Sequence, residues 1–127
     1  MDKYTVRVTA DFSAAHFLSH YHGKCEHLHG HNYHVRLWAQ GRELGEGGML
    51  VDFALLKDAL RQVCNKLDHT NLNENAVFSN NPSAERIARY IFDEVSRLLN
   101  PEIAEFLSAV DVFETPGSMA RYKNDDN

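Results

Sequence analysis

Apolar and polar residues alternate over residues 4–12, where every even position is apolar and every odd position is polar. A period of two is typical of a strand with one buried face. The alternation returns over residues 33–39, and we expect this second strand to begin in the histidine-rich stretch before it. The glycines of GRELGEGGML, residues 41–50, predict a turn into a short third strand over residues 49–51.

Apolar residues at helical spacing predict two helices. The first has Asp52 as its N-cap, carries apolar residues from Phe53 to Leu67 and stops near LDHTNLNEN; the second begins after Ser83 and ends at Asn100 and Pro101. The segment SAVDVFETPGSMARY, residues 108–122, predicts a hairpin with a Pro-Gly turn. This order predicts an α+β domain, with an antiparallel sheet of the four-stranded type and two helices on one face.

Length and charge narrow the class of protein. The 127 residues fit one domain, covering residues 1–127. The net charge of -5 argues against nucleic acid or an anionic membrane as a partner. No apolar run approaches the roughly 20 residues of a membrane span, and the chain does not start like a signal peptide, so we expect a cytoplasmic protein. In that reducing compartment Cys25 and Cys64 are expected as free thiols, with Cys64 in the core.

Seven of the eight histidines lie within residues 16–34. In an extended segment residues i and i+2 share a face, so His29 and His31 can bind one ion. His16, at the end of the neighbouring strand, can supply a third nitrogen, and His27 is the alternative third ligand. Three imidazoles with an open fourth position are typical of catalytic zinc. The histidines therefore predict a zinc site at which a substrate completes the coordination.

Cys25 lies four residues before His29 and beside Lys24. As a ligand it would make a site closer to structural zinc, whereas as a base or nucleophile it would gain from a cation and a metal that favour its thiolate. The residues leave both alternatives open. The helical HExxH pattern of metalloproteases is absent from the sequence, and a hydrolase is not the expected activity.

Two further groups are candidates for catalysis or binding: the adjacent residues Asp68 and His69, and the single residue Glu114. Asp68 and His69, in LDHTNLN, directly follow the first predicted helix, where a loop can carry them to a site. A direct bond between their side chains would require irregular backbone, because adjacent helical residues do not face each other. Glu114, in VFETPG, lies at a strand end. Taken alone, each also fits an ordinary solvated helix end or strand end.

Five short motifs occur together in one order: FSAAH, CxxxHGHN, LDHxxLN, NPSxE and VxVxET. In this order and spacing the chain resembles the 6-pyruvoyl-tetrahydropterin synthase and 6-carboxytetrahydropterin synthase family, over about residues 4–122. The resemblance implies the tunnelling fold, or T-fold, in which three subunits join their sheets into a barrel and two such trimers stack. It thus implies a homohexamer with active sites between subunits. Such an assembly would also cover the exposed edges of a small sheet.

The resemblance also implies a substrate, 7,8-dihydroneopterin triphosphate, and a Zn²⁺ cofactor that binds its side-chain hydroxyls and acidifies the adjoining C–H. Neither nicotinamide nor flavin is required. By the same resemblance the functional residues are His16, His29 and His31 for zinc, Cys25, Asp68 and His69 for catalysis, and Glu114 for the pterin ring.

The product is the point on which the family divides. The three-residue gap between Cys25 and His29 resembles the 6-carboxytetrahydropterin synthases of queuosine biosynthesis, which also cut the side chain to release acetaldehyde. The pyruvoyl synthases more often have a longer gap, so we favour the carboxy branch. Phe17 replaces the more usual arginine after the zinc histidine, and Lys24 is a candidate contact for the triphosphate.

Two other classes of function fit the same residues. One is a non-catalytic zinc-binding assembly module with the T-fold, although a degenerate relative should have lost some of the catalytic residues that this chain retains. The other is a zinc lyase or hydratase that acts on a different small substrate.

Overall fold

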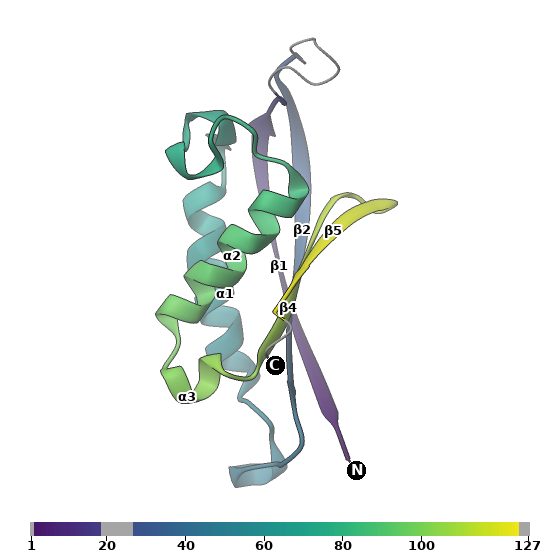
Figure 1. Ribbon diagram of the computed structural model, residues 1–127, viewed down its shortest axis with the longest axis vertical. Coiled ribbons are helices and arrows are strands. Elements are labelled where there is room, and N and C mark those ends of the chain that lie inside the picture. The colour runs from purple at the N-terminus through teal and green to yellow at the C-terminus, as the bar shows by residue number, and fades with distance from the viewer. Residues whose placement is uncertain (1, 19–26, 125–127) are drawn as a thin grey trace.

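The computed structural model of the chain describes residues 2–18 and 27–124 (Figure 1). Two long helices lie side by side on one face of a twisted sheet, as an α+β domain requires. The elements, in chain order, are β1 (Tyr4–His16), β2 (His29–Gly41), η1 (Glu46–Gly48), α1 (Phe53–Leu67), β3 (Thr70–Asn71), η2 (Leu72–Glu74), η3 (Ala76–Phe78), α2 (Ala84–Leu98), α3 (Pro101–Ala104), β4 (Leu107–Thr115) and β5 (Ser118–Lys123).

The sheet has five strands in the order β3-β1-β2-β4-β5. The pairs β1–β2, β2–β4 and β4–β5 are antiparallel, as the alternation and the Pro-Gly hairpin predict. The short strand β3 instead runs parallel to the end of β1, so the sheet is mixed. Because β3 has two residues, it leaves no periodic pattern in the sequence, and the prediction of a wholly antiparallel sheet is wrong at this edge.

The predicted third strand over residues 49–51 is also wrong. This segment is an irregular loop that follows the 3₁₀ turn η1 and leads directly into α1. Leu50 and Val51 pack against the core from the loop, so their apolar character reflects burial and not strand pairing. Gly47 and Gly48 have φ angles of 70° and 72°, which only glycine adopts readily.

Both long helices begin where the sequence predicts. The carboxylate of Asp52 accepts a hydrogen bond from the Ala54 N–H at 2.9 Å, and Ser83 Oγ accepts one from the Arg86 N–H at 3.2 Å. The apolar stripe of α1, including Cys64, is buried against the sheet. Pro101 does not simply end α2, because it begins the short helix α3 as its first residue.

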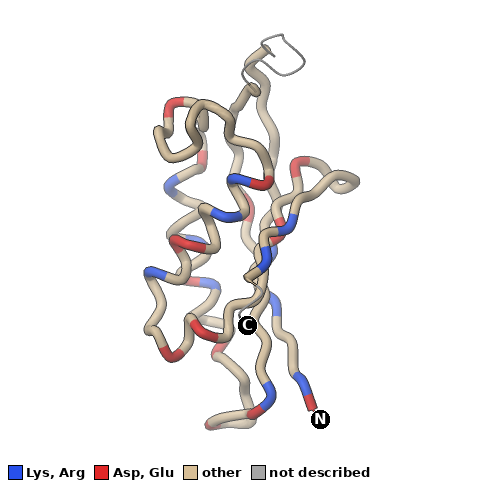
Figure 2. The backbone as a smooth tube through the Cα atoms, in the orientation of Figure 1, with Lys and Arg blue, Asp and Glu red and all other residues tan. Residues whose placement is uncertain are grey.

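The face of the sheet opposite the long helices carries polar pairs. Asp111 is buried there and accepts two hydrogen bonds from the Arg121 guanidinium, at 2.6 and 3.0 Å, and one from Trp38 Nε1 at 2.7 Å. On the same face, His34 Nδ1 lies 2.7 Å from an Asp11 oxygen. Basic and acidic residues are interspersed along the described chain (Figure 2). Within that part of the chain, every helix is too short or too polar to cross a bilayer.

Candidate metal centre and active site

Three histidines converge where β1 ends and β2 begins. The antiparallel register places His16 opposite His29, and His31 lies two residues further along β2 on the same face. One ring nitrogen from each can be chosen so that all lie within 4.8 Å of one another. Their ring centroids are 4.6 to 5.0 Å apart. The structure thus brings together the three residues that the sequence proposes as ligands.

Backbone carbonyls fix the orientation of two of these rings. His16 Nδ1 donates to the Pro82 carbonyl at 3.0 Å, and His29 Nδ1 donates to the His27 carbonyl at 2.9 Å. With the proton on Nδ1, each neutral ring directs an Nε2 lone pair at the other, and these two nitrogens are 3.0 Å apart. Two facing lone pairs repel each other unless a cation binds both, so with this tautomer the donor set fits a metal ion.

The third ring fits the same ion. His31 Nε2 is buried and has no hydrogen-bond partner within the described residues. Burial lowers the pKa of His31, and the neighbouring His16 and His29 lower it further, while Glu114 opposes them. The lowered pKa favours the neutral imidazole that a metal requires.

The other histidines have different surroundings. His27 contributes its carbonyl group to the site, and its ring is outside the metal-binding group that the described residues form. His34 faces the opposite side of the sheet, where it pairs with Asp11. His20, His22, Lys24 and the catalytic candidate Cys25 lie outside the described residues.

Glu114 borders the three histidines. Its carboxylate oxygens lie 4.0 Å from His16 Nε2 and 3.8 Å from His31 Nε2, and its side chain is 29% exposed. The register between β4 and β5 shifts between Phe113 and Thr115, which leaves Glu114 as an unpaired residue. A bulge changes the direction of the side chain at that position. Here the residue at the bulge is Glu114, whose partly exposed carboxylate lies beside the histidines.

Asp68 and His69 form a pair immediately after α1. Asp68 Oδ2 accepts a hydrogen bond from His69 Nδ1 at 2.9 Å, and Asp68 Oδ1 accepts one from the Ser13 N–H at 2.8 Å. The Ser13 N–H is the main reason that the pKa of Asp68 is lowered, and the hydrogen bond from His69 adds to it. The carboxylate therefore stays ionised, and it holds the His69 ring through Nδ1.

His31 and His69 line the same pocket, which has a volume of about 480 Å³ and lies over the end of the sheet. Ser13 and Asn32 also line it, and Ser13 Oγ donates to Asn32 Oδ1 at 2.6 Å. Of the histidine cluster and the Asp68–His69 pair, this pocket is lined by His31 and His69. The cluster can bind a metal, and His69 can exchange a proton with a molecule that lies in the pocket.

Sequence reasoning missed Tyr33 as part of this site. Its ring packs edge-on against His16 and His31, with centroids 6.0 and 5.5 Å apart, and stacks on Phe12 at 4.7 Å. The side chain is fully buried, and its hydroxyl has no partner within the described residues. Burial raises the pKa of Tyr33, so the phenol stays neutral. The alternation marks Tyr33 as buried but gives no sign that it borders histidines.

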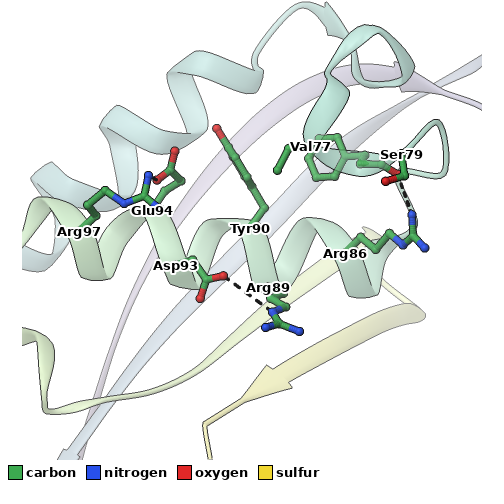
Figure 3. Close-up of a pocket in the computed structure, with 9 residues that line it drawn as sticks. Val77, Ser79, Arg86, Arg89, Tyr90, Asp93, Glu94 and Arg97 are labelled. Carbon is green, nitrogen blue, oxygen red and sulfur yellow. Dashed lines mark hydrogen bonds and ion pairs between the residues drawn. The ribbon is translucent and has the colours of Figure 1, made fainter.

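A second pocket, of about 350 Å³, lies along the outer side of α2 (Figure 3). Its arginines already have partners. Arg86 donates to the Phe78 carbonyl at 2.7 Å, and Arg89 and Arg97 are paired with acidic residues of the same helix. Two of its three arginines are thus paired with carboxylates, and Arg86 is bound to a neutral carbonyl.

Comparison with known proteins gives matches over nearly the whole chain. Residues 5–125 match the family model described as 6-pyruvoyl tetrahydropterin synthase. A 6-carboxy-5,6,7,8-tetrahydropterin synthase from Synechocystis is 40% identical over 116 residues, which are 87% of this chain and 86% of that protein. The corresponding protein of Bacillus subtilis is 37% identical over 87% of this chain and 79% of its own length.

A solved structure has the same fold. The 6-pyruvoyl tetrahydropterin synthase of Caenorhabditis elegans superposes with a TM-score of 0.83 at 30% identity, over 98% of each chain. The T-fold expected from the sequence motifs is therefore confirmed for the single chain.

Proposed function

The chain belongs to the 6-pyruvoyl tetrahydropterin synthase family, and from that membership we propose that it is a zinc-dependent 6-carboxy-5,6,7,8-tetrahydropterin synthase of queuosine biosynthesis. Its substrate is 7,8-dihydroneopterin triphosphate, and its products are 6-carboxytetrahydropterin, acetaldehyde and triphosphate. The observation that carries the proposal is the facing pair of Nε2 atoms, 3.0 Å apart, beside the carboxylate of Glu114. The relatives that are 40% and 37% identical bear this enzyme's name, which favours the carboxy branch.

In this proposal His16, His29 and His31 hold zinc through their Nε2 atoms. When bound, zinc acts as a Lewis acid that makes the C–H groups next to the substrate's side-chain hydroxyls easier to deprotonate. The separation of 3.0 Å between His16 Nε2 and His29 Nε2 is short enough for both nitrogens to bind one ion.

The protein residues orient the substrate and move its protons. Glu114 accepts two parallel hydrogen bonds from the pterin, one from a ring N–H and one from the exocyclic amine. The Cys25 thiolate removes a proton from a side-chain carbon, and His69, held by Asp68, exchanges a proton elsewhere on the side chain. Triphosphate leaves as an anion, and no net oxidation occurs. Atom balance requires the uptake of one water in the carboxy branch and none in the pyruvoyl branch.

The pyruvoyl branch is the second candidate. A Drosophila melanogaster relative named 6-pyruvoyl tetrahydrobiopterin synthase is 38% identical over 80% of this chain and 62% of its own length. The solved Caenorhabditis elegans structure bears a related name. A non-catalytic zinc-binding T-fold module is a third candidate, and the Asp68–His69 pair beside the pocket argues against it.

We further propose a cytoplasmic homohexamer, a dimer of trimers with active sites between subunits. In the described part of the chain, β3 pairs with Ala14 and Ala15 of β1 at one edge of the sheet, and β5 is the other edge. Exposed edges of this kind invite pairing with another copy, which would close three sheets into a barrel. Light scattering should give the mass of a hexamer, and a concentration-independent monomer would contradict the assembly.

The activity is tested with purified protein and 7,8-dihydroneopterin triphosphate. We expect triphosphate release that is lost after treatment with a chelator and restored by Zn²⁺ but not by Mg²⁺, because neutral imidazoles suit zinc and not magnesium. Metal analysis should find about one zinc per chain. Triphosphate release at an unchanged rate after complete removal of the metal would contradict the zinc dependence.

A further inference from the structure

The side chain of Asn73, in the 3₁₀ turn η2, binds the backbone at the end of β1. Asn73 Oδ1 accepts a hydrogen bond from the Phe17 N–H at 2.8 Å, and Asn73 Nδ2 donates to the Phe17 carbonyl at 2.8 Å. One amide thus satisfies both polar groups of a single residue, as a neighbouring strand would. Phe17 directly follows His16, which is 97% buried and is the least exposed of the three histidines.

The same amide also reaches the loop that orients His16 from the other side. Asn73 Nδ2 lies 3.1 Å from the Asn80 carbonyl oxygen and 3.0 Å from Asn80 Oδ1. Ser79 and Asn80 have φ angles of 50° and 62°, a left-handed conformation that costs energy in residues other than glycine. Two residues later, the Pro82 carbonyl accepts the hydrogen bond from His16 Nδ1 at 3.0 Å.

These contacts form a ring of bonded and hydrogen-bonded groups that begins and ends at His16. It runs from His16 to Phe17 along the chain, across the Asn73 amide to Asn80, along the loop to Pro82, and back to the His16 ring. The backbone of Asn73 is itself fixed, because its N–H donates to Asn71 Oδ1 at 3.1 Å. The amide therefore has a defined position from which it holds both the backbone and the ring partner of His16.

We propose that Asn73 is a positioning residue of the metal site, which keeps His16 Nε2 directed at His29 and His31. This inference rests on the proposed function, in which those three residues bind zinc. Groups that orient a metal-binding histidine typically contribute about 10- to 100-fold to metal affinity. The side-chain amide both accepts from the Phe17 N–H and donates to its carbonyl, which neither alanine nor an ionised aspartate can do.

The test compares Asn73→Ala with Asn75→Ala. Asn75 is a matched control from the same loop, since its Oδ1 also accepts a backbone hydrogen bond, from the Val77 N–H at 3.2 Å. Zn²⁺ affinity is measured by competition with a chromogenic chelator, and the visible spectrum of the Co²⁺ form reports ligand geometry. We expect Asn73→Ala to bind Zn²⁺ about 10- to 100-fold more weakly and to change the Co²⁺ spectrum, and Asn75→Ala to match the wild type.

Circular dichroism first establishes that each variant is folded. If Asn73→Ala does not fold, Asn73→Asp is measured instead, because it keeps the acceptor for the Phe17 N–H but loses the donor; the same weakening is expected. Wild-type affinity and an unchanged Co²⁺ spectrum in a folded Asn73 variant would overturn the inference while leaving the zinc site intact. A wild-type protein that binds neither Zn²⁺ nor Co²⁺ would instead overturn the proposed function, and this inference with it.

Discussion

Asp68 Oδ2 lies 2.9 Å from Nδ1 of His69, although the two residues are neighbours in the chain. The contact is possible because His69 has a left-handed φ of 57°, which turns its ring back toward the Asp68 carboxylate. The sequence indicates that a direct bond between these side chains needs irregular backbone, and His69 provides it. The pair forms within one chain. Because the His69 side chain is 84% exposed, its ring is accessible to a ligand or to a neighbouring subunit.

The first prediction concerns this pair. Asp68→Asn should lower turnover by roughly a hundredfold to ten-thousandfold, because the amide no longer fixes the His69 tautomer needed for proton transfer. Zinc content should not change, since neither residue belongs to the histidine cluster. Single-turnover rates and metal analysis on the same sample check both points. Asp58→Asn, on the exposed side of α1, is the matched control and should behave as the wild type.

The second prediction concerns pH. The pKa of Asp68 is lowered in the folded protein from its usual value of 3.8, so its ionised form stabilises the fold above that value. As pH falls through the lowered folded pKa, this stabilisation is lost. Urea unfolding of metal-free protein should show wild type more stable than Asp68→Asn at neutral pH. The difference should shrink below about pH 4; a difference that grows as the solution becomes more acidic would reverse the assigned sign.

The third prediction separates the metal ligands from the other histidines. His29→Ala and His31→Ala should each lose most of the bound zinc, because two imidazoles hold the ion far less tightly than three. His34→Ala should keep its zinc, since His34 lies on the same strand but pairs with Asp11 on the opposite face. Metal analysis of purified variants checks this. Unchanged zinc in both ligand variants would defeat the assignment.

The fourth prediction separates the thiol from the imidazoles. If Cys25 is the proton-transfer group, Cys25→Ala should keep zinc near the wild-type level while turnover falls by roughly a hundredfold to ten-thousandfold. A fourth protein ligand would close the position that the substrate needs. Zinc content and single-turnover rate are measured together, because steady-state rates can conceal a change in product release. Parallel loss of zinc and activity would instead identify Cys25 as a ligand.

Much of the fold follows from periodic patterns in the sequence. The alternation around Tyr33 predicts β2, and the helical stripe after Asp52 predicts α1, because burial on one face imposes a period on each. Two features lack such a period. Strand β3 is too short to show one, and the apolar residues Leu50 and Val51 are buried from a loop, where no strand pairing occurs.

In the site, too, the sequence predicts what depends on local strand geometry and not what depends on tertiary contacts. The spacing of His29 and His31 predicts that they share a face, since that depends only on strand geometry. The position of Glu114 beside them depends on strand order and on a bulge in β4, neither of which has a local signal. The Pro82 carbonyl and the Asn73 amide are likewise brought to His16 by tertiary contacts alone.

The most direct test of the central proposal is the identity of the products. Zinc-loaded protein is incubated with 7,8-dihydroneopterin triphosphate, the pterin is identified by mass, and acetaldehyde and triphosphate are quantified in the same reaction. We predict 6-carboxytetrahydropterin with acetaldehyde and triphosphate in equal amounts. Triphosphate release with a pyruvoyl pterin and no acetaldehyde would contradict the carboxy branch, and recovery of unchanged substrate would contradict catalysis altogether.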